Sequence, residues 1–389
     1  MSGAVREALQ AVRALRPRFE AAGSEMDRAR RLPQDLVEAL VEAGLFRLAL
    51  PRAAGGAEVD LLGFLDVAEA LAAADGSAGW CLVQGSFSAA QVVAFLGPEA
   101  VREVFGDGKT VLANGTGNGG TAVPVEGGYR LSGRWPFASG CTHATWYKAA
   151  ARVVGAGGEE PCGRDARPEI RTFLFPASAD YVEDTWHVSG LRGTGSHTIA
   201  VEEVLVPSRR APDLTRDVRL EGGALYRMPA SLLAAAGFSA VAMGIARGAL
   251  DAFAELARGK TPRGARATLG QDAVVQDKVA RVEATLRSAQ AFLRQAAGAA
   301  WDVLAGGEDL SVRQRALLRL AATHGSNQAA GVVDVIYHAA GATAIFESEG
   351  LARRFRDVHA VTQQIQSSDL HYQAVGRVLL GLEPHSDYV

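Results

Sequence analysis

The sequence has few cysteines and no long apolar run. Three cysteines occur among 389 residues, at positions 81, 141 and 162. Such an odd, widely spaced set fits neither a disulfide framework nor a metal site. No stretch of 18 apolar residues is present, and the N-terminus has no apolar segment of the signal-peptide kind. These absences predict a protein of the reducing cytoplasm, with no membrane span and no metal.

Neither sign of charge dominates the chain. Lys and Arg number 40 against 43 Asp and Glu, for a net charge of −3, and no run of five like charges occurs. Nucleic acids and anionic membranes select strongly basic surfaces, so the sequence predicts neither as a partner. Its length predicts two or three domains.

The hydrophobic period changes twice along the chain. Residues 1–109 have a helical period, residues 110–215 alternate like short strands separated by Gly-rich turns, and residues 216–389 return to long helical periods. We therefore expect an α+β, mainly α protein with an N-terminal helical domain, a central antiparallel β-barrel or sandwich domain and a C-terminal four-helix bundle. The fourth bundle helix is expected over roughly 350–380, and a polar hairpin tip over 153–170.

Residues 131–147, "LSGRWPFASGCTHATWY", contain several aromatic residues, and Ser139-Gly140 interrupts the strand pattern between them. One reading is a core strand with a bulge, which is the usual role of an aromatic strand. The other is the wall of a planar ligand, with Trp135 or Phe137 against its face and Ser139 as a hydrogen-bonding partner. The nearby "GTGNGG" at 115–120 matches a dinucleotide fingerprint in letters only, because a β-hairpin pattern and no helix follows it.

Six motifs occur in one order and resemble the acyl-CoA dehydrogenase fold along nearly the whole chain. They are "RRLPQDLVEALVEAGLFRLALPRAAGGAEVD", "ADGSAGW", "GGYRLSGRWPFASGCTHATWY", "VSGLRGTGSHTIAVEEVLVP", "GIARGALDAFAELA" and "FRDVHAVTQQI". The sequence of the third motif is most similar to that of the two-component flavin-dependent monooxygenases, the branch that includes 4-hydroxyphenylacetate hydroxylase and dibenzothiophene monooxygenase.

This resemblance implies that the planar ligand is an isoalloxazine ring. It implies a monooxygenase that takes reduced FAD or FMN from a separate reductase and uses O2 to oxygenate a small organic substrate through a C4a-hydroperoxyflavin. No NAD(P)H motif is visible, which fits a separate reductase. A homotetramer is expected from the residues themselves, because "GIARGALDAFAELARGK" and "GVVDVIYHAAGATAIF" carry more apolar and small residues than one bundle needs. Two alternatives stay open: an FAD-dependent dehydrogenase or oxidase, and a non-catalytic flavin-binding protein.

The resemblance also assigns site residues. Phe137 and Ser139 stand where the family has its flavin-facing Trp and Thr, and two arginines resemble one that a neighbouring subunit offers to the flavin nucleotide. The cofactor-binding candidates are Asn114, Thr116, Trp135, Phe137, Ser139, Gly140, Arg192, Arg263 and Arg266, and the catalytic candidates are Ser139, Gln364 and His143. Without the resemblance, Arg192 belongs equally well to a tight turn, and Arg263 and Arg266 to a solvated helix start.

A general base is missing from the expected places. Residues 230–250 contain no Asp or Glu, and the stretch after Arg356-Asp357 carries glutamines where dehydrogenases place a Glu. The monooxygenase branch often has a His at or next to Gln364. Ordinary acyl-CoA dehydrogenation is therefore not expected, because it needs a carboxylate base. Any base must be sought among the other histidines: His143, His197, His359 and His371.

Overall fold

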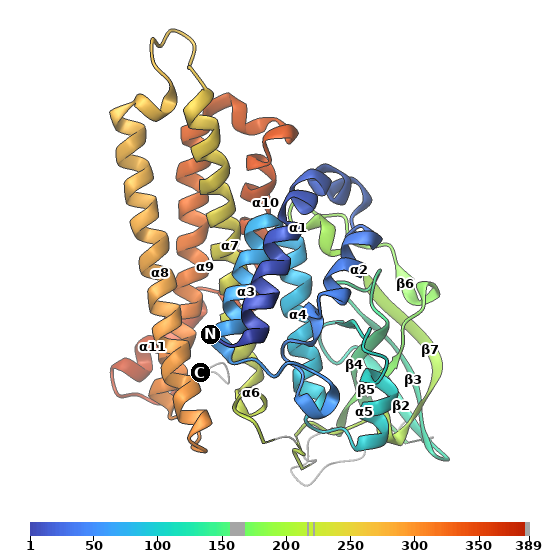
Figure 1. Ribbon diagram of the computed structural model, residues 1–389. Helices are drawn as coiled ribbons and strands as arrows, with labels where there is room; N and C mark the ends of the chain where they lie inside the picture. The colour runs from blue at the N-terminus through green and yellow to red at the C-terminus, as the bar shows by residue number, and fades with distance from the viewer. Residues whose placement is uncertain (156–167, 216–217, 221, 386–389) are drawn as a thin grey trace.

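The computed structural model describes residues 1–155, 168–215, 218–220 and 222–385. Figure 1 shows three layers: the C-terminal helices on one side, the sheet on the other, and the N-terminal helices between them. The family-type α+β architecture expected from the sequence is confirmed. Most of the expected hairpin tip, 156–167, and Cys162 with it, lies outside the described residues.

The N-terminal layer is built on two capped helices. Asp60 and Asp75 accept hydrogen bonds from Gly63 N and Ala78 N at 2.6 and 2.8 Å, and so fix the starts of α3 and α4. Helix α4 is buried along almost all of its length because the sheet covers one side and the bundle the other. The helices are α1 (Gly3–Ala29), α2 (Gln34–Glu42), α3 (Leu61–Ala74), α4 (Gly76–Val93) and α5 (Pro98–Phe105).

The sheet is mixed. Antiparallel pairing joins β2 to β3, β3 to β7, β4 to β5 and β6 to β7, as expected, whereas β1 and β2 both run parallel to β4. The strands are β1 (Leu112–Asn114), β2 (Gly120–Val125), β3 (Gly128–Trp135), β4 (Trp146–Val153), β5 (Ile170–Pro176), β6 (Val182–Glu183) and β7 (Thr198–Pro207).

Strand β4 pairs with β1 and β2 one after the other along its length. β1 pairs with residues 146–148 and β2 with residues 151–153. The Gly-rich segment 115–119 between β1 and β2 is therefore looped out beside the middle of β4. Lys148 pairs with the last residue of β1, Asn114, and both Lys148 and Ala150 line an open space beside this segment.

The bundle departs from the expected four continuous helices. The helix expected over 350–380 is two helices, with a 3-10 turn, η9 (Ile365–Ser367), between them. The Gln364 side chain caps that turn by accepting from Gln366 N at 2.6 Å, which offers the backbone an alternative to the helix. The helices are α6 (Ala224–Arg227), α7 (Ala230–Gly259), α8 (Ala273–Ala305), α9 (Val312–Ala340), α10 (Leu351–Thr362) and α11 (Leu370–Leu379).

Short 3-10 turns complete the described chain. They are η1 (Leu45–Arg47), η2 (Arg52–Ala54), η3 (Ala179–Tyr181), η4 (Arg192–Thr194), η5 (Ser208–Arg210), η6 (Leu269–Gln271), η7 (Gly341–Ile345), η8 (Glu347–Glu349) and η9. Among the described helices, α7 alone is long and apolar enough to cross a membrane, yet 89% of that apolar window is buried inside the protein. Its composition is that of a core helix, since it packs against α3, α4, α9 and α10.

Candidate active site

A cavity of about 910 Å³ lies where α4, the sheet, the 186–196 segment and the bundle meet. Its size is that of a pocket for a cofactor or a drug-sized molecule. Large aromatic side chains form much of its wall: Trp80, Phe87, Phe137, Trp186 and Phe238. Trp80 and Phe238 stack with ring centroids 4.1 Å apart, which joins helix α4 to helix α7 at the cavity.

Ser139 is the first of three hydroxyl residues that are joined by hydrogen bonds into a chain beside this cavity. Trp80 Nε1 lies 2.9 Å from Ser139 Oγ, and Ser139 Oγ lies 2.8 Å from Ser196 Oγ. Ser196 Oγ lies 2.6 Å from Thr194 Oγ1, which donates to the carbonyl oxygen of Leu191 at 2.8 Å. All three hydroxyl residues are buried and line the cavity.

The chain has a fixed direction. A carbonyl oxygen can only accept, so the proton of Thr194 is committed to Leu191. Ser196 must then donate to Thr194, and Ser139 must donate to Ser196. The Trp80 indole N–H can only donate, so it also points at Ser139 Oγ. Toward the cavity, Ser139 therefore offers a lone pair and no proton.

The backbone of Leu191 anchors the far end of this chain. Leu191 has a left-handed φ of 50°, and its carbonyl also accepts from Trp186 Nε1 at 3.1 Å. Its N–H donates to Asp357 Oδ1 at 2.6 Å. Burial, only partly offset by Arg353, raises the pKa of Asp357 to about 6. The orientation of Ser139 thus depends on α10 as well as on the sheet.

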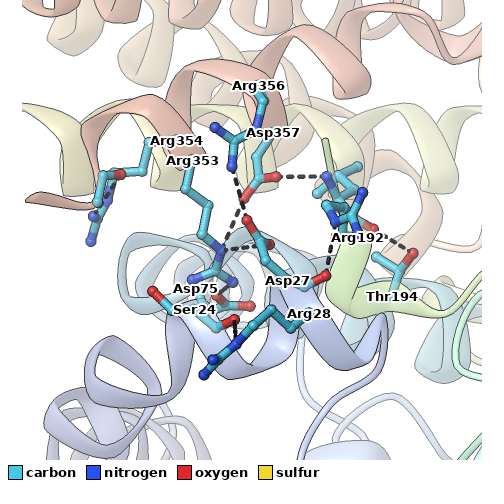
Figure 2. A network of polar contacts seen from close by, with 12 residues as sticks. Ser24, Asp27, Arg28, Asp75, Arg192, Thr194, Arg353, Arg354, Arg356 and Asp357 are labelled. Atoms are coloured by element: carbon cyan, nitrogen blue, oxygen red, sulfur yellow. Dashed lines mark hydrogen bonds and ion pairs between the residues drawn. The ribbon is translucent and has the colours of Figure 1, made fainter. Parts of the chain in front are cut away.

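Figure 2 shows Asp27, Asp75 and Asp357 gathered around the arginines of α10. Arg353 forms ion pairs with Asp27 and Asp75, and Arg356 pairs with Asp27 at 2.9 Å. Burial lowers the pKa of the Arg353 guanidinium, but the three carboxylates outweigh it and raise the pKa overall. The network ties the end of α1, the start of α4 and the 189–192 segment to α10.

The structure brings several of the predicted site residues together. Of the sequence candidates, five line the cavity: Asn114, Thr116, Phe137, Ser139 and Gln364. Phe137 is 59% exposed, has a left-handed φ of 58°, and meets Trp186 edge-on at 6.0 Å between centroids. A non-glycine residue held in this conformation at a cavity is typical of a functional site.

Three other candidates lie beside the cavity wall rather than on it. Trp135 is fully buried in the sheet core and donates to the Ala150 carbonyl at 2.8 Å. Gly140, at φ 80°, has His143 Nε2 only 3.0 Å from where a Cβ would stand. Burial lowers the pKa of His143 to about 4, and neither ring nitrogen has a hydrogen-bond partner among the described residues. Their proposed roles in binding and catalysis stay predictions.

The arginine candidates lie elsewhere. Arg192 donates to the backbone carbonyls of Asp27 and Val188, both at 2.8 Å, and borders a second, polar cavity of about 950 Å³. Arg263 and Arg266 are exposed on the α7–α8 connection, which Figure 1 shows projecting from the end of the bundle away from the sheet. A role for them at a flavin would require the cavity of another subunit.

The remaining histidine candidates have structural partners. His197 Nδ1 accepts from the backbone N–H groups of Thr185 and Trp186 at 3.2 Å. His359 pairs with Asp334 at 2.8 Å, and His371 bonds the Ile365 carbonyl at 2.7 Å. Neither these three nor His143 belong to the described residues that line the cavity.

Sequence reasoning missed a polar group at one end of the cavity. Its members, which we call the polar end, are Gln84, Ser88, Gln91, Asn114 and Lys148. Gln84 and Ser88 both contact Asn114 Oδ1, and Lys148 Nζ donates to Gln91 Oε1 at 3.2 Å. Only Asn114 had been predicted. Gln84, Ser88 and Gln91 follow one another at helical spacing and so share one face of α4, a pattern in the sequence that could have indicated them.

The residues present fit a flavin. The cavity offers aromatic and apolar walls for the faces of a three-ring system, and Ser139 offers an acceptor for the N–H that a reduced flavin carries at N5. Asn114, at the end of β1, and Thr116, on the glycine-rich segment that follows it, would contact the ring edge or the ribityl chain. When bound, reduced flavin supplies the electrons that activate O2.

Two family descriptions match the chain: "Acyl-CoA dehydrogenase, N-terminal domain" over residues 5–106 and "Acyl-CoA dehydrogenase, C-terminal domain" over residues 236–368. Indole-3-acetate monooxygenase of Pseudomonas putida is 33% identical over 94% of this chain and 91% of its own length. The oxygenase subunit HsaA of a flavin-dependent monooxygenase of Rhodococcus jostii is 32% identical, covering 90% and 92%.

Two solved structures are also similar to this chain over nearly its whole length. XiaF of Streptomyces, in complex with FADH2 and glycerol, superposes with a TM-score of 0.89 at 27% identity, covering 99% of this chain and 98% of that one. The 3-HSA hydroxylase of Rhodococcus has a TM-score of 0.85 at 30% identity, covering 98% and 99%.

Proposed function

The chain belongs to the family of flavin-dependent monooxygenase oxygenase components built on the acyl-CoA dehydrogenase fold, and from this premise we propose how its own cavity works. It is an oxidoreductase that uses reduced flavin and O2 to oxygenate a small organic molecule. The observation that carries this proposal is the orientation of Ser139, whose only free bonding position in the aromatic cavity is an acceptor.

We propose that Ser139 binds the N–H at N5 of the reduced ring and thereby holds that proton in place. Phe137 and Trp186 would cover the ring, and Trp80 and Phe238 would keep water from its reactive edge. The reduced flavin would come from a separate reductase, either as FAD or as FMN, and Gln364 would orient the substrate.

The dehydrogenase alternative lacks a necessary group. A dehydrogenase needs a carboxylate aimed at the substrate, and no Asp or Glu occurs among the cavity-lining residues within the described ranges. A non-catalytic protein would bind flavin in the aromatic cavity, but it would have no use for the separate polar groups of the polar end. We therefore favour the oxygenase.

A reconstituted assay tests this function. The protein is mixed with a flavin reductase, NADH, FAD or FMN and air, and offered indoles and phenols of the kinds named for its relatives. We expect an oxygenated product that requires both the reductase and O2. A two-electron dehydrogenated product formed without the reductase would support the dehydrogenase instead.

We predict that Gln364→Ala weakens substrate binding or coupling only modestly. The Gln364 carbonyl oxygen is committed to Gln366 N, which leaves its NH2 group to donate into the cavity. Loss of one such bond should cost about 0.5–1.5 kcal/mol. Wild type and variant should show the same pH profile, because an amide does not titrate. A rate loss beyond about a hundredfold, or a lost ionisation near neutral pH, would instead indicate coupling to a catalytic acid or base.

We propose a homotetramer of the cytoplasm that uses neither nucleic acid nor membrane. The apolar residues of α7 are buried within the chain and do not support this. Ile345 and Phe346 do, because they are 64% and 61% exposed and adjacent on the surface. We predict a tetramer in sedimentation velocity at micromolar concentration, and dissociation or weakening by the double substitution Ile345→Ser and Phe346→Ser. A stable monomer would refute the prediction.

A further inference from the structure

Lys148 is the one charged side chain among the described residues that line the cavity. It projects from β4 beside the looped-out 115–119 segment, and within the described residues its ammonium group donates to one partner, Gln91 Oε1 at 3.2 Å. No salt bridge to it is present in the described part of the chain. The residue is half-buried, and this burial lowers the pKa of the Lys148 ammonium to about 8.

The charge of the whole cavity follows from this residue. Across the lining residues that the structure describes, Lys148 is the single Lys, Arg, His, Asp or Glu. A partly buried ammonium without a carboxylate is destabilised, and a ligand of opposite charge would relieve that cost. The other members of the polar end are neutral amides and a hydroxyl, which can share hydrogen bonds with such a ligand but cannot neutralise it.

Ser139 and the polar end contact different parts of α4. Ser139 bonds Trp80, near the start of α4, whereas Lys148 bonds Gln91, eleven residues further along the same helix. At a rise of about 1.5 Å per residue, these two positions on α4 lie about 16 Å apart along its axis. A substrate that reacts near Ser139 would therefore place its far end toward Lys148.

We propose that the substrate of this enzyme is an aromatic monoanion, whose carboxylate binds Lys148 at the polar end. The inference rests on the proposed function and names its substrate class. One positive charge matches a singly charged group, whereas a flavin phosphate carries nearly two negative charges and would leave the cavity net negative. The remaining amide N–H groups of Gln84 and Gln91 supply the hydrogen bonds that direct the anionic oxygen, whereas the Ser88 hydroxyl donates to Asn114 Oδ1.

The proposal has a pH signature with a definite sign. Binding requires the ammonium, so affinity for the anion should be constant below about pH 8 and fall as pH rises above it. Burial is the sole cause of the lowered pKa, and no acidic or basic side chain faces Lys148 from α4, the sheet or the loop among the described lining residues. Lys148→Arg should move this limb to higher pH, because arginine stays charged.

Matched acid and amide pairs test the proposal on the purified full chain without flavin. The probes are indole-3-acetate with indole-3-acetamide, and benzoate with benzamide, followed by quenching of Trp80 and Trp186, which both line the cavity. We expect at least one acid to bind about tenfold or more tightly than its amide, the value of a hydrogen bond to a charged group. In Lys148→Met the preference should vanish, and in Lys148→Arg it should persist in part.

Three outcomes would overturn the proposal. The first is that the wild type binds acid and amide equally, or binds no acid. The second is an acid preference that survives in Lys148→Met. The third is a loss of FMN affinity in Lys148→Met without a change in the acid-to-amide ratio. The last would assign Lys148 to the cofactor phosphate. Because these titrations need no turnover, failure of oxygenation with a retained acid preference would refute the proposed function and leave this inference standing.

Discussion

Replacing Arg353 by methionine is expected to lower the free energy of unfolding by about 3–5 kcal/mol. Arg353 is the counter-charge of Asp75 and lies near Asp357, and these two carboxyl residues are 3% and 2% exposed. Methionine would keep most of the packing of the side chain but leave two buried carboxylates without their cation. Removing one partner of a buried pair costs far more than removing an exposed one.

This loss should depend on pH. The folded-state pKa of Asp357, about 6, lies above the ordinary value of 3.8, so the folded protein binds this proton more tightly than the unfolded chain does. Protonation of Asp357 therefore adds stability as pH falls through 6, and the same contribution is lost as pH rises. Without Arg353 the pKa of Asp357 should rise further, so the variant should recover part of its stability at pH 5.

Chemical denaturation of the two proteins at pH 5 and pH 8 measures both effects. Arg18→Met is the matched control, because Arg18 pairs with Asp35 on the surface, where the side chains are 48% and 68% exposed. The control should lose no more than about 1 kcal/mol. If Arg353→Met lost no more than this control, the network would not hold the layers together as described.

Replacing Ser139 by alanine is expected to abolish most of the preference of the site for reduced over oxidised flavin. The N–H at N5 of the reduced ring would lose its acceptor, at a cost of about 1–3 kcal/mol, which corresponds to a factor of about 5 to 150 in affinity. Oxidised flavin has an acceptor at N5 and gains nothing from an acceptor on Ser139, so its affinity should change little. During turnover, we expect more hydrogen peroxide and less product.

Two further variants separate this effect from general damage. Trp80→Phe removes a donor to Ser139 but leaves the direction of the hydroxyl chain unchanged, so the preference for reduced flavin should persist. Ser196→Ala frees the Ser139 proton to point into the cavity, so oxidised flavin should bind more tightly. Anaerobic titrations with both redox forms provide the readout. An unchanged ratio in Ser139→Ala would remove Ser139 from the flavin site.

The order of the domains and the position of Ser139 could be predicted because both depend on local patterns. Alternation and helical period identify elements, and the break at Ser139-Gly140 stands out within an aromatic strand. Lys148 could not be predicted in the same way. In "TWYKAAARVV" it reads as an ordinary outward-facing strand residue, and its partner Gln91 lies 57 residues earlier in the chain.

Arg192 shows a second limit of the sequence. The resemblance predicted that Arg192 binds the cofactor, and nothing in the motif indicates that the preceding Leu191 adopts a left-handed conformation. In the structure the arginine lines the second cavity and bonds two backbone carbonyls. Likewise, the break in the fourth bundle helix comes from the Gln364 side-chain cap, which a helical period cannot indicate.

The most direct test of the account is a rapid-mixing experiment on the anaerobic protein loaded with reduced flavin. On mixing with oxygenated buffer, we expect oxidised flavin to return only after a lag, because Ser139 holds the N5 proton in a cavity walled by Trp80, Phe137 and Trp186. The lag should shorten sharply in Ser139→Ala. Return of oxidised flavin in a single phase without a lag, as for free flavin, would contradict the claim that this cavity is an oxygenase site.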